Sequence, residues 1–478
     1  MRRSVANILL MNTPKSSLQI SCVQALAKNA SEWESIMQIK LSDHFTYGKL
    51  LRFTISSIMM MIFTSIYSVV DGFFVSNFVG KTPFAAVNFI MPVLMILGAV
   101  GFMFGTGGGA LVAKTMGEGK TEKANEQFSL FVYVSALCGV VLAVLGIVFM
   151  PHIARLLGAE GEMLENCVVY GCVILVALPA FMLQIEFQSF FITAEKPQLG
   201  LAVTVAAGVT NMILDALLVA GLRWGLVGAA LATAISQFVG GSIPFFYFLR
   251  PNTSLLRLGK TKFDGKALVK ACSNGASELM SNISMSLVGM LYNAQLLKYA
   301  GENGIAAYGV LMYVSMIFNA VFIGYAIGVA PVISFHYGAQ NREELKGLLR
   351  KSLVIIGGFS ISMFVLAEVL ADPLSHLFVG YDAELLELTC RGFFFFSFAF
   401  LFMGIAIYGS SFFTALNDGL TSALISFLRT MVFQVAAVLL LPLIWKIDGV
   451  WISIVAAEVM AVVMTGLFLV IKRKKYQY

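Results

Sequence analysis

Charged side chains are scarce in this sequence: Asp, Glu, Lys and Arg make up 12% of its 478 residues, against about 25% in soluble domains. Apolar residues make up 59%. They fall in runs of roughly 20–30 residues, and each run is long enough to span the ~30 Å hydrocarbon core of a bilayer. The composition excludes an ordinary water-soluble chain and predicts an integral membrane protein built from helices.

The motifs of a nucleotide-driven motor or a metalloenzyme are also missing. Gly-Lys-Thr occurs at 80–82, 119–121 and 259–261, but a P-loop needs a Gly five residues earlier, where Val75, Lys114 and Ser254 stand. The four histidines lack the spacing of metal ligands, and the six cysteines form no Cys-x-x-Cys pair. We therefore expect no enzyme activity and no cofactor, with uphill transport driven by an ion gradient.

Twelve helical spans are predicted, at about 49–77, 84–113, 128–151, 163–192, 199–221, 225–249, 268–298, 305–335, 351–379, 388–413, 420–445 and 449–471. With the N-terminus inside, 25 of the 32 Lys and Arg residues fall on the cytoplasmic side and five outside, while Arg391 and Arg429 lie within spans. The positive-inside rule then places both termini in the cytoplasm. The net charge of +6 follows from this topology and needs no nucleic-acid partner.

The same pattern divides the chain into five parts. Residues 1–41 are predicted to be a polar cytoplasmic extension, because their apolar run is too short for a signal peptide, and Met37 is an alternative start. Residues 42–249 and 268–472 each form a lobe of six spans. The basic stretch 250–267 links the lobes, and 473–478 is a basic cytoplasmic tail.

The two lobes resemble each other in sequence. Residues 85–117 align without gaps on residues 306–338, with ten of 33 positions identical, including Ala85 with Ala306 and Gly117 with Gly338. The offset is 221, and the same offset pairs Thr193-Ala194 with Thr414-Ala415. Six helices separate equivalent spans, so the repeat is parallel. Internal repeats around a central cavity are typical of secondary transporters.

Two carboxylates stand in strongly apolar spans, at Asp71 and Asp215. An acid at this depth costs roughly 2.5–3.5 kcal/mol on insertion scales, so it usually faces an internal cavity and handles ions or protons. Tyr67 lies one helical turn before Asp71 and Asn211 one turn before Asp215, while Thr233 is on the next span. These oxygen groups suit a small cation, or the two acids share a proton. Local capping of each acid is the structural alternative.

Several stretches resemble the multidrug and toxic compound extrusion (MATE) family, in a bacterial branch near the DinF and MepA groups. They are YSVVDGFFVSNFVG (67–80), AAVNF (85–89), GGGALVAKTMGEGK (107–120), QSFFITAEKPQLG (188–200), TNMILDALLV (210–219) and GLVGAALATAISQ (225–237). The resemblance covers about 42–472. It implies a V-shaped pair of six-helix bundles that exchanges cationic or amphipathic drugs for Na⁺ or H⁺.

The resemblance also implies roles for particular residues. Archaeal members bind a cation through an Asp, an Asn–Asp pair and a Thr; in this chain Asp71, Asn211, Asp215 and Thr233 match them, and Tyr67 matches a hydrogen-bonding Tyr. The chain departs from many members at Ser56, where they have Pro, so a Pro-driven kink of the first span is not expected.

The second lobe has no such set. The repeat equivalents of Asp71, Asn211 and Asp215 are roughly Tyr292, Gln434 and Val438. Glu278 resembles an acid that other members use in that lobe, and Glu186 and Glu458 are further candidates. Arg429 either pairs with Glu458 or extends to the membrane interface.

Three functions are consistent with this sequence. Cation-coupled export of cationic or amphipathic drugs is the first hypothesis, with a multi-pass monomer in the bacterial cytoplasmic membrane in contact with lipid. A flippase for lipid-linked oligosaccharides is the alternative, although such a protein is expected to line its cavity with several Arg and Lys residues. A membrane scaffold without transport is the third, which the buried acids disfavour.

Overall fold

The computed structural model describes residues 39–478, and no strand occurs in that range. Most of the predicted extension 1–41 therefore lies outside the described residues. The helices of the first half are α3 (Tyr47–Phe78), α4 (Lys81–Met103), π-helix η1 (Phe104–Gly108), α5 (Gly109–Gly117), α6 (Thr121–Leu156), α7 (Gly161–Thr193), α8 (Pro197–Leu214), π-helix η2 (Asp215–Gly221) and α9 (Gly225–Leu249). We call this half the N-lobe.

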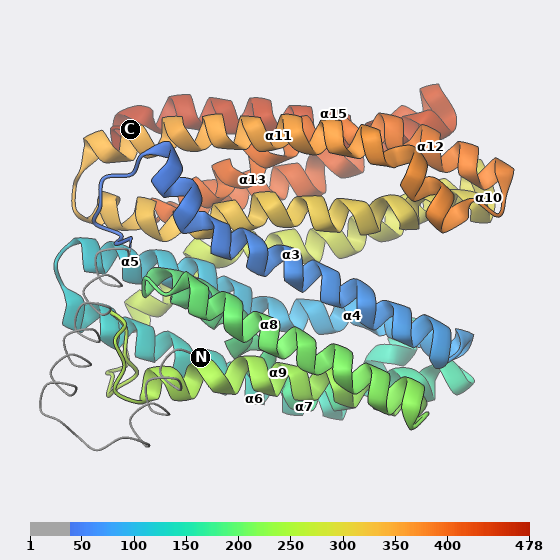
Figure 1. Cartoon of the computed structure of the whole chain (residues 1–478), viewed down its shortest axis with the longest axis horizontal. Helices are drawn as coiled ribbons and strands as arrows, with labels where there is room; N and C mark the ends of the chain where they lie inside the picture. Colours follow the sequence, from blue (N-terminus) through green and yellow to red (C-terminus); the bar gives the residue numbers. More distant parts are fainter. Residues whose placement is uncertain (1–38) are drawn as a thin grey trace, which may run out of the picture.

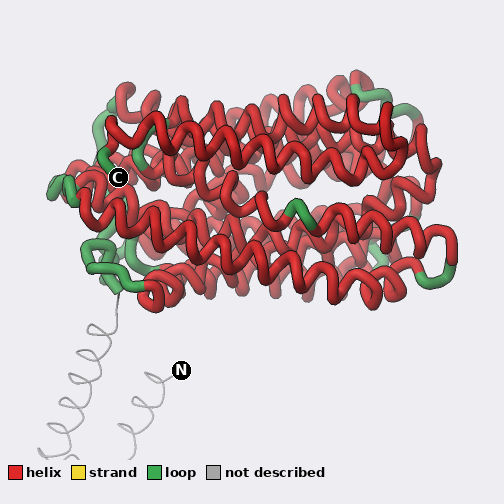
Figure 2. Tube along the Cα trace, turned by 90° about the horizontal axis from the view of Figure 1, so that it is seen from above, coloured by secondary structure: helices red, strands yellow, loops and turns green. Residues whose placement is uncertain are grey.

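The second half, the C-lobe, contains α10 (Gly265–Gly338), α11 (Arg342–Val379), α12 (Ala383–Ser397), α13 (Phe400–Ala415), α14 (Gly419–Phe427), π-helix η3 (Leu428–Phe433) and α15 (Gln434–Tyr476). The two lobes lie side by side as bundles of long helices, with α3 running obliquely between them (Figure 1). Nearly all of the connecting loops lie at the two ends of the bundles (Figure 2).

The predicted number of spans agrees with the helices once two breaks are recognised. Within 39–478, nine helices are long and apolar enough to cross a membrane, and the bent pair α12–α13 makes a tenth. Both α10 and α15 contain one residue with positive φ, Gly301 (61°) and Lys446 (51°), and each break joins two helices. Divided at Lys446, residues 419–476 supply two spans, and the more polar helix 265–300 completes twelve.

Four spans differ locally from regular α-helices. The span predicted at 388–413 bends by 48° between α12 and α13, where hydrogen bonds from Ala399 to Phe396 and from Leu401 to Phe398 tighten the turn. The spans that contain η1, η2 and η3 widen into π-helices instead. In contrast, α3 is a single helix of 32 residues through Ser56, in agreement with the absence of a proline there.

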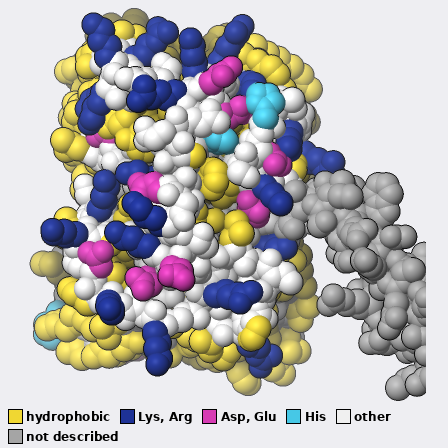
Figure 3. Space-filling model, turned by 90° about the vertical axis from the view of Figure 1, so that its left-hand side faces the viewer, with side chains coloured by type: hydrophobic (Ala, Val, Ile, Leu, Met, Phe, Trp, Pro, Cys, Tyr) yellow, Lys and Arg dark blue, Asp and Glu magenta, His cyan; other side chains and the backbone are white. Residues whose placement is uncertain are grey.

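One end of the molecule is rich in Lys and Arg, as Figure 3 shows. This basic end carries the start of α3, the 250–264 linker and the C-terminus. The end of the chain is packed rather than free: the Tyr476 hydroxyl donates to Asp418 Oδ2 at 2.8 Å, and Tyr478 stacks edge-on against Phe412. The predicted tail 473–478 thus folds back onto the C-lobe.

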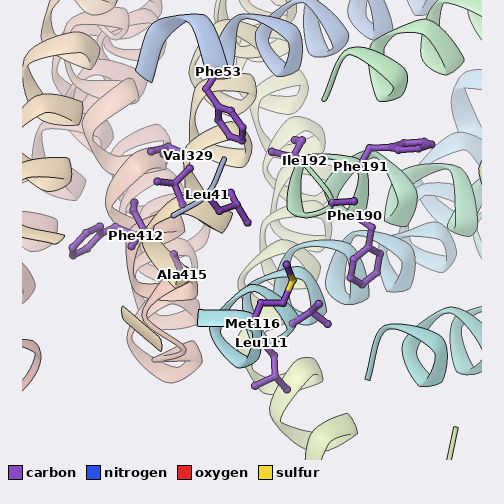
Figure 4. Packing of buried hydrophobic residues seen from close by; sticks show 14 of the residues in the cluster. Leu41, Phe53, Leu111, Met116, Phe190, Phe191, Ile192, Val329, Phe412 and Ala415 are labelled. Atoms are coloured by element: carbon purple, nitrogen blue, oxygen red, sulfur yellow. The ribbon is translucent and has the colours of Figure 1, made fainter. Parts of the chain in front are cut away.

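The lobes are joined at the basic end and separate at the other. One buried apolar cluster contains residues from both lobes, such as Phe53 and Phe190 with Val329 and Phe412 (Figure 4). Two further clusters each belong to a single lobe, one built around Tyr170 and the other around Trp451. Burial of apolar area therefore holds the lobes together on one side only.

A short strap before α3, residues 39–46, crosses between the lobes at the basic end. The Leu41 amide donates to Glu195 Oε1 of the N-lobe at 2.6 Å. The Phe45 amide donates to Glu344 Oε1 of the C-lobe at 2.9 Å, and His44 Nδ1 lies 2.6 Å from the other oxygen of that carboxylate. The Leu41 and Phe45 side chains are fully buried, so this strap is fixed to both lobes.

Candidate functional site

Four of the predicted residues meet inside the N-lobe, where α3, α8 and α9 come together. The Thr233 hydroxyl of α9 donates a hydrogen bond to Asp71 Oδ1 of α3 at 3.4 Å. The side chains of Asn211 and Asp215 adjoin the same Asp71 carboxylate. Residues 162 positions apart in sequence are thus brought together by the packing of α3, α8 and α9 against one another.

Local backbone geometry sets the directions of these groups. Asn211 lies in the last turn of α8 and Asp215 is the first residue of η2, so the pair spans a change from α- to π-helix. π-Helical turns of this kind often accompany functional groups. Tyr67, one turn before Asp71, packs against α8 at Gly208, where a Cβ would lie 2.8 Å from the tyrosine ring.

Two further polar residues of α7 belong to this cluster and were missed from the sequence. Tyr170 is buried, and its hydroxyl faces Asp71, Asp215 and Thr233. The Gln184 side chain neighbours the Tyr67 hydroxyl. A tyrosine within an apolar span is too common to indicate a site, so only the packing of α7 against α9 reveals the part that Tyr170 plays.

The cluster is buried and its polar atoms are short of partners. Asp215 has no exposed surface and Asn211 is 1% exposed. Both carboxylate oxygens of Asp215, both amide atoms of Asn211 and the Tyr170 hydroxyl make no hydrogen bond with the described residues. Unpaired polar atoms at this depth are costly. A small cation held by oxygen atoms, or a proton on the acids, fits this donor set.

The equivalent place in the C-lobe is built differently. Tyr292 is buried there, stacks on Tyr308 with ring centroids 5.4 Å apart, and pairs through its hydroxyl with Ser453 Oγ at 2.8 Å. Val438 is fully buried. A hydrogen-bonded aromatic pair and an apolar side chain thus stand where the N-lobe has its acids, so the site is confined to one half of the repeat.

A cavity of about 250 Å³ lies between the lobes, next to their joined ends. Its wall includes Gly105 and Thr106 of η1, Asn282 of α10, and Ser410 and Ser426 of the C-lobe. Glu278 also lines it, and its carboxylate forms no ion pair with any described residue. Glu278 therefore faces the chamber between the lobes rather than the bundle surface.

Glu186 lies behind the wall of this chamber. It is fully buried in α7 and its backbone packs against Gly105, while both carboxylate oxygens lack hydrogen-bond partners among the described residues. Ser135 of α6 is a neighbouring polar side chain. Ser189 and Thr193, one and two turns further on, reach the cavity itself.

Both arginines of the predicted spans pair with acids of the C-lobe. Arg429 Nε donates to both carboxylate oxygens of Glu458, at 3.0 and 2.9 Å, and Arg429 Nη2 lies 2.9 Å from Oε1. Arg391 Nη2 lies 2.6 Å from Asp448 Oδ2. From the sequence, Arg429 could either pair with Glu458 or extend to the membrane interface. In the structure it pairs with Glu458.

Comparison with solved structures agrees with this fold. A structure described as MATE in complex with MaL6 superposes with a TM-score of 0.86 at 21% identity, covering 91% of this chain and 98% of the other. An outward-facing multidrug resistance MATE family transporter gives the same score, and a MOP superfamily transporter from Pyrococcus furiosus gives 0.84. At this level of identity the likeness concerns the fold.

Sequence comparison identifies the family. The multidrug export protein MepA of Staphylococcus haemolyticus is 26% identical over 321 residues, or 67% of this chain and 71% of the relative. MepA of Staphylococcus aureus strain MSSA476 is 24% identical over 72% of this chain and 76% of its own. The MatE family model matches twice, at residues 56–217 and 279–440. The two matches span both lobes and more than half of the sequence, and the chain therefore belongs to the MATE family of membrane transporters.

Proposed function

We propose that this protein exports cationic or amphipathic compounds across the bacterial plasma membrane in exchange for Na⁺ or H⁺. The observation that carries the proposal is the buried Asp71–Asp215 cluster, whose unpaired oxygen atoms suit a proton or a small cation. Its near relatives are named as multidrug export proteins. The binding of a coupling ion and of a drug is linked when the two favour different states of the lobes.

The arrangement of the lobes supports alternating access. Where α3 crosses the second part of α10, Gly324 and Gly328 lie directly against Ser57 and neighbouring backbone. Towards the other end, a Cβ added at Gly72 or Gly309 would meet no atom of another helix within 4 Å. If the basic end faces the cytoplasm, as the positive-inside rule requires, this state is closed to the cytoplasm and parted towards the outside.

The charges of the C-lobe argue against a flippase for pyrophosphate-linked lipids. Such a substrate needs free cations in the cavity, but Arg429 and Arg391 are already paired with acids. Glu278 adds a negative charge to the chamber. These groups favour a positively charged substrate.

The test is ethidium accumulation in an efflux-deficient bacterial host. Wild-type protein should lower accumulation, whereas Asp71→Asn and Asp215→Asn should not, while all three reach the membrane in equal amounts. Asp372→Asn is the matched control, because that acid is exposed on α11. Unchanged accumulation with wild-type protein across a panel of cationic dyes would refute drug export, and full activity in both mutants would refute the site.

The coupling ion is named by two changes to the same assay. Replacing Na⁺ with K⁺ abolishes efflux if Na⁺ drives it, and a protonophore abolishes efflux if H⁺ does. Because both ions would use the same carboxylates, the variants alone do not separate them, and the two ionic conditions are needed.

A further inference from the structure

The Arg429–Glu458 pair extends from the wall of the central cavity into the C-lobe behind it. Arg429, in η3, lines the cavity, while Glu458, on the second part of α15, stands behind it with its side chain 1% exposed. Three contacts of 2.9–3.0 Å connect the guanidinium to the carboxylate. Contacts with both carboxylate oxygens fix the guanidinium in orientation as well as compensating its charge.

This pair decides the charge of the chamber. Glu278 and Arg429 are the charged residues among those that line the cavity. Arg429 is neutralised from behind, whereas Glu278 has no cationic partner in residues 39–478. The remaining lining is hydroxyl, amide and apolar, including Ser281 and Met285. When its carboxyl group is ionised, Glu278 thus gives the chamber an uncompensated negative charge in surroundings of low dielectric, where that charge acts strongly.

We propose that Glu458 is a specificity-determining residue: by neutralising Arg429, it leaves Glu278 as the charge that selects organic cations. Glu458 acts through Arg429 and does not touch the substrate. The inference rests on the proposed export function and adds the residue that sets the sign of the substrate's charge. Without Glu458, the Arg429 guanidinium faces the chamber as a free cation, offsets Glu278 and admits anions.

A purely structural role for the pair makes a different prediction. If Arg429 and Glu458 only hold η3 against α15, their loss weakens binding of cations and anions alike. If the pair sets the charge of the chamber, loss of Glu458 weakens the binding of cations and strengthens the binding of anions. Removing both charges together then restores cation binding, because the chamber regains its single negative charge.

The experiment measures binding of tetraphenylphosphonium and tetraphenylborate, which have similar size and opposite charge, to purified protein in nanodiscs of zwitterionic lipid. Binding to empty nanodiscs is subtracted. We expect wild-type protein to prefer tetraphenylphosphonium. Glu458→Gln should weaken the binding of tetraphenylphosphonium on the order of tenfold and strengthen the binding of tetraphenylborate, because the unpaired Arg429 cation repels the first ion and attracts the second. The double variant Arg429→Gln/Glu458→Gln should regain the wild-type preference.

Asp448→Asn is the matched control, since it removes the acid of the other Arg–carboxylate pair of the C-lobe, and neither of its residues lines the cavity. It should not alter the ion preference. Elution as a single species in gel filtration establishes that each variant is folded. If Glu458→Gln does not elute in this way, the ion preference of the double variant is compared with that of wild-type protein, and this comparison tests the inference.

Three outcomes overturn the inference: a wild-type protein without preference for the cation, a Glu458→Gln protein with unchanged preference, or a folded double variant that does not regain it. Failure of the proposed function is distinguishable, because it leaves the binding preferences intact while ethidium accumulation in cells stays unchanged.

Discussion

Gly117 and Gly338 occupy equivalent positions of the repeat and make reciprocal contacts across the lobe interface. A Cβ at Gly117 would clash with the carbonyl oxygen of Phe335, and a Cβ at Gly338 with that of Lys114. Phe335 follows Lys114 by 221 residues, as Gly338 follows Gly117. The offset of the sequence repeat is therefore also the symmetry of the joined ends, where two helices cross backbone to backbone.

Substitution Gly338→Ala should push the lobes apart, because the obstructing atom is a backbone carbonyl that cannot rotate away. We expect a loss of about 1–3 kcal/mol, the usual cost of overpacking, in spite of the better helix propensity of alanine. The melting temperature in detergent measures it. Gly309→Ala is the control, because Gly309 is on the same helix and a Cβ added there would meet no atom of another helix within 4 Å. Equal melting temperatures for the two variants would contradict the close backbone contact between the two helices at Gly338.

Tyr170→Phe should impair coupling without unfolding the protein. The substitution removes a hydroxyl that faces the two acids of the N-lobe and forms no hydrogen bond with residues 39–478, so little packing is lost. We expect ethidium efflux to fall several-fold with an unchanged melting temperature. Tyr408→Phe is the matched control, because that tyrosine is equally buried and unpaired but lies in the C-lobe. Equal activity of the two variants would remove Tyr170 from the site.

Glu344→Gln should release the 39–46 strap from the C-lobe. The neutral amide cannot accept from His44 and Phe45 and balance Lys351 as the carboxylate does. Trypsin should then cut after the exposed Lys40 several-fold faster than in wild-type protein. Glu343→Gln changes the preceding, exposed residue of the same turn and should leave the cleavage rate unaltered. A strap equally protected in both variants would show that Glu344 does not hold it.

Acid should loosen the docked C-terminus through Asp418. Burial raises the pKa of this carboxyl, but hydrogen bonds from Tyr476, Thr421 and Lys472 outweigh burial, so its pKa is lowered from 3.8. Because this pKa is lowered, the ionised Asp418 carboxylate stabilises docking of the tail at pH values above its ordinary pKa. The contribution disappears as the pH falls through the folded-state pKa. Trimming of Tyr478 by carboxypeptidase Y should therefore speed up below about pH 4 in wild-type protein.

The variant Asp418→Asn provides the reference for that measurement. It should be trimmed quickly at neutral pH, and its rate should follow only the pH dependence of the peptidase itself. A wild-type rate that parallels the variant throughout would show that the carboxylate does not hold the tail.

The sequence predicted most of the fold because apolar length and the distribution of Lys and Arg depend on simple partitioning. Twelve spans, the repeat and the meeting of Asp71 with Asn211 and Asp215 could be expected from it. The position of Tyr170 beside the two acids could not be predicted, because it depends on how α7 packs against α9. The bend at Ala399 and the π-helices also escaped, because they depend on hydrogen-bond register rather than on residue type.

The strap and the docked tail show another limit of sequence reasoning. Polar termini of membrane proteins are expected to be solvated, yet Phe45 and Tyr478 pack into the same apolar cluster at the joined ends of the lobes. Contacts between residues 299 positions apart, such as Phe45 with Glu344, cannot be read from local pattern.

Each of the three π-helices carries a group that matters to the site: Thr106 of η1 at the cavity, Asp215 at the start of η2, and Arg429 in η3. A π-turn accommodates one residue more than an α-turn. Deleting one residue from such a turn would restore a regular helix and leave its two flanks nearly aligned, but each side chain within the turn would change its direction by up to about 100°. The directions of these side chains are therefore encoded in chain length as well as in residue identity, and single-residue gaps at 104–108, 215–221 and 428–433 are where relatives with different substrates should diverge.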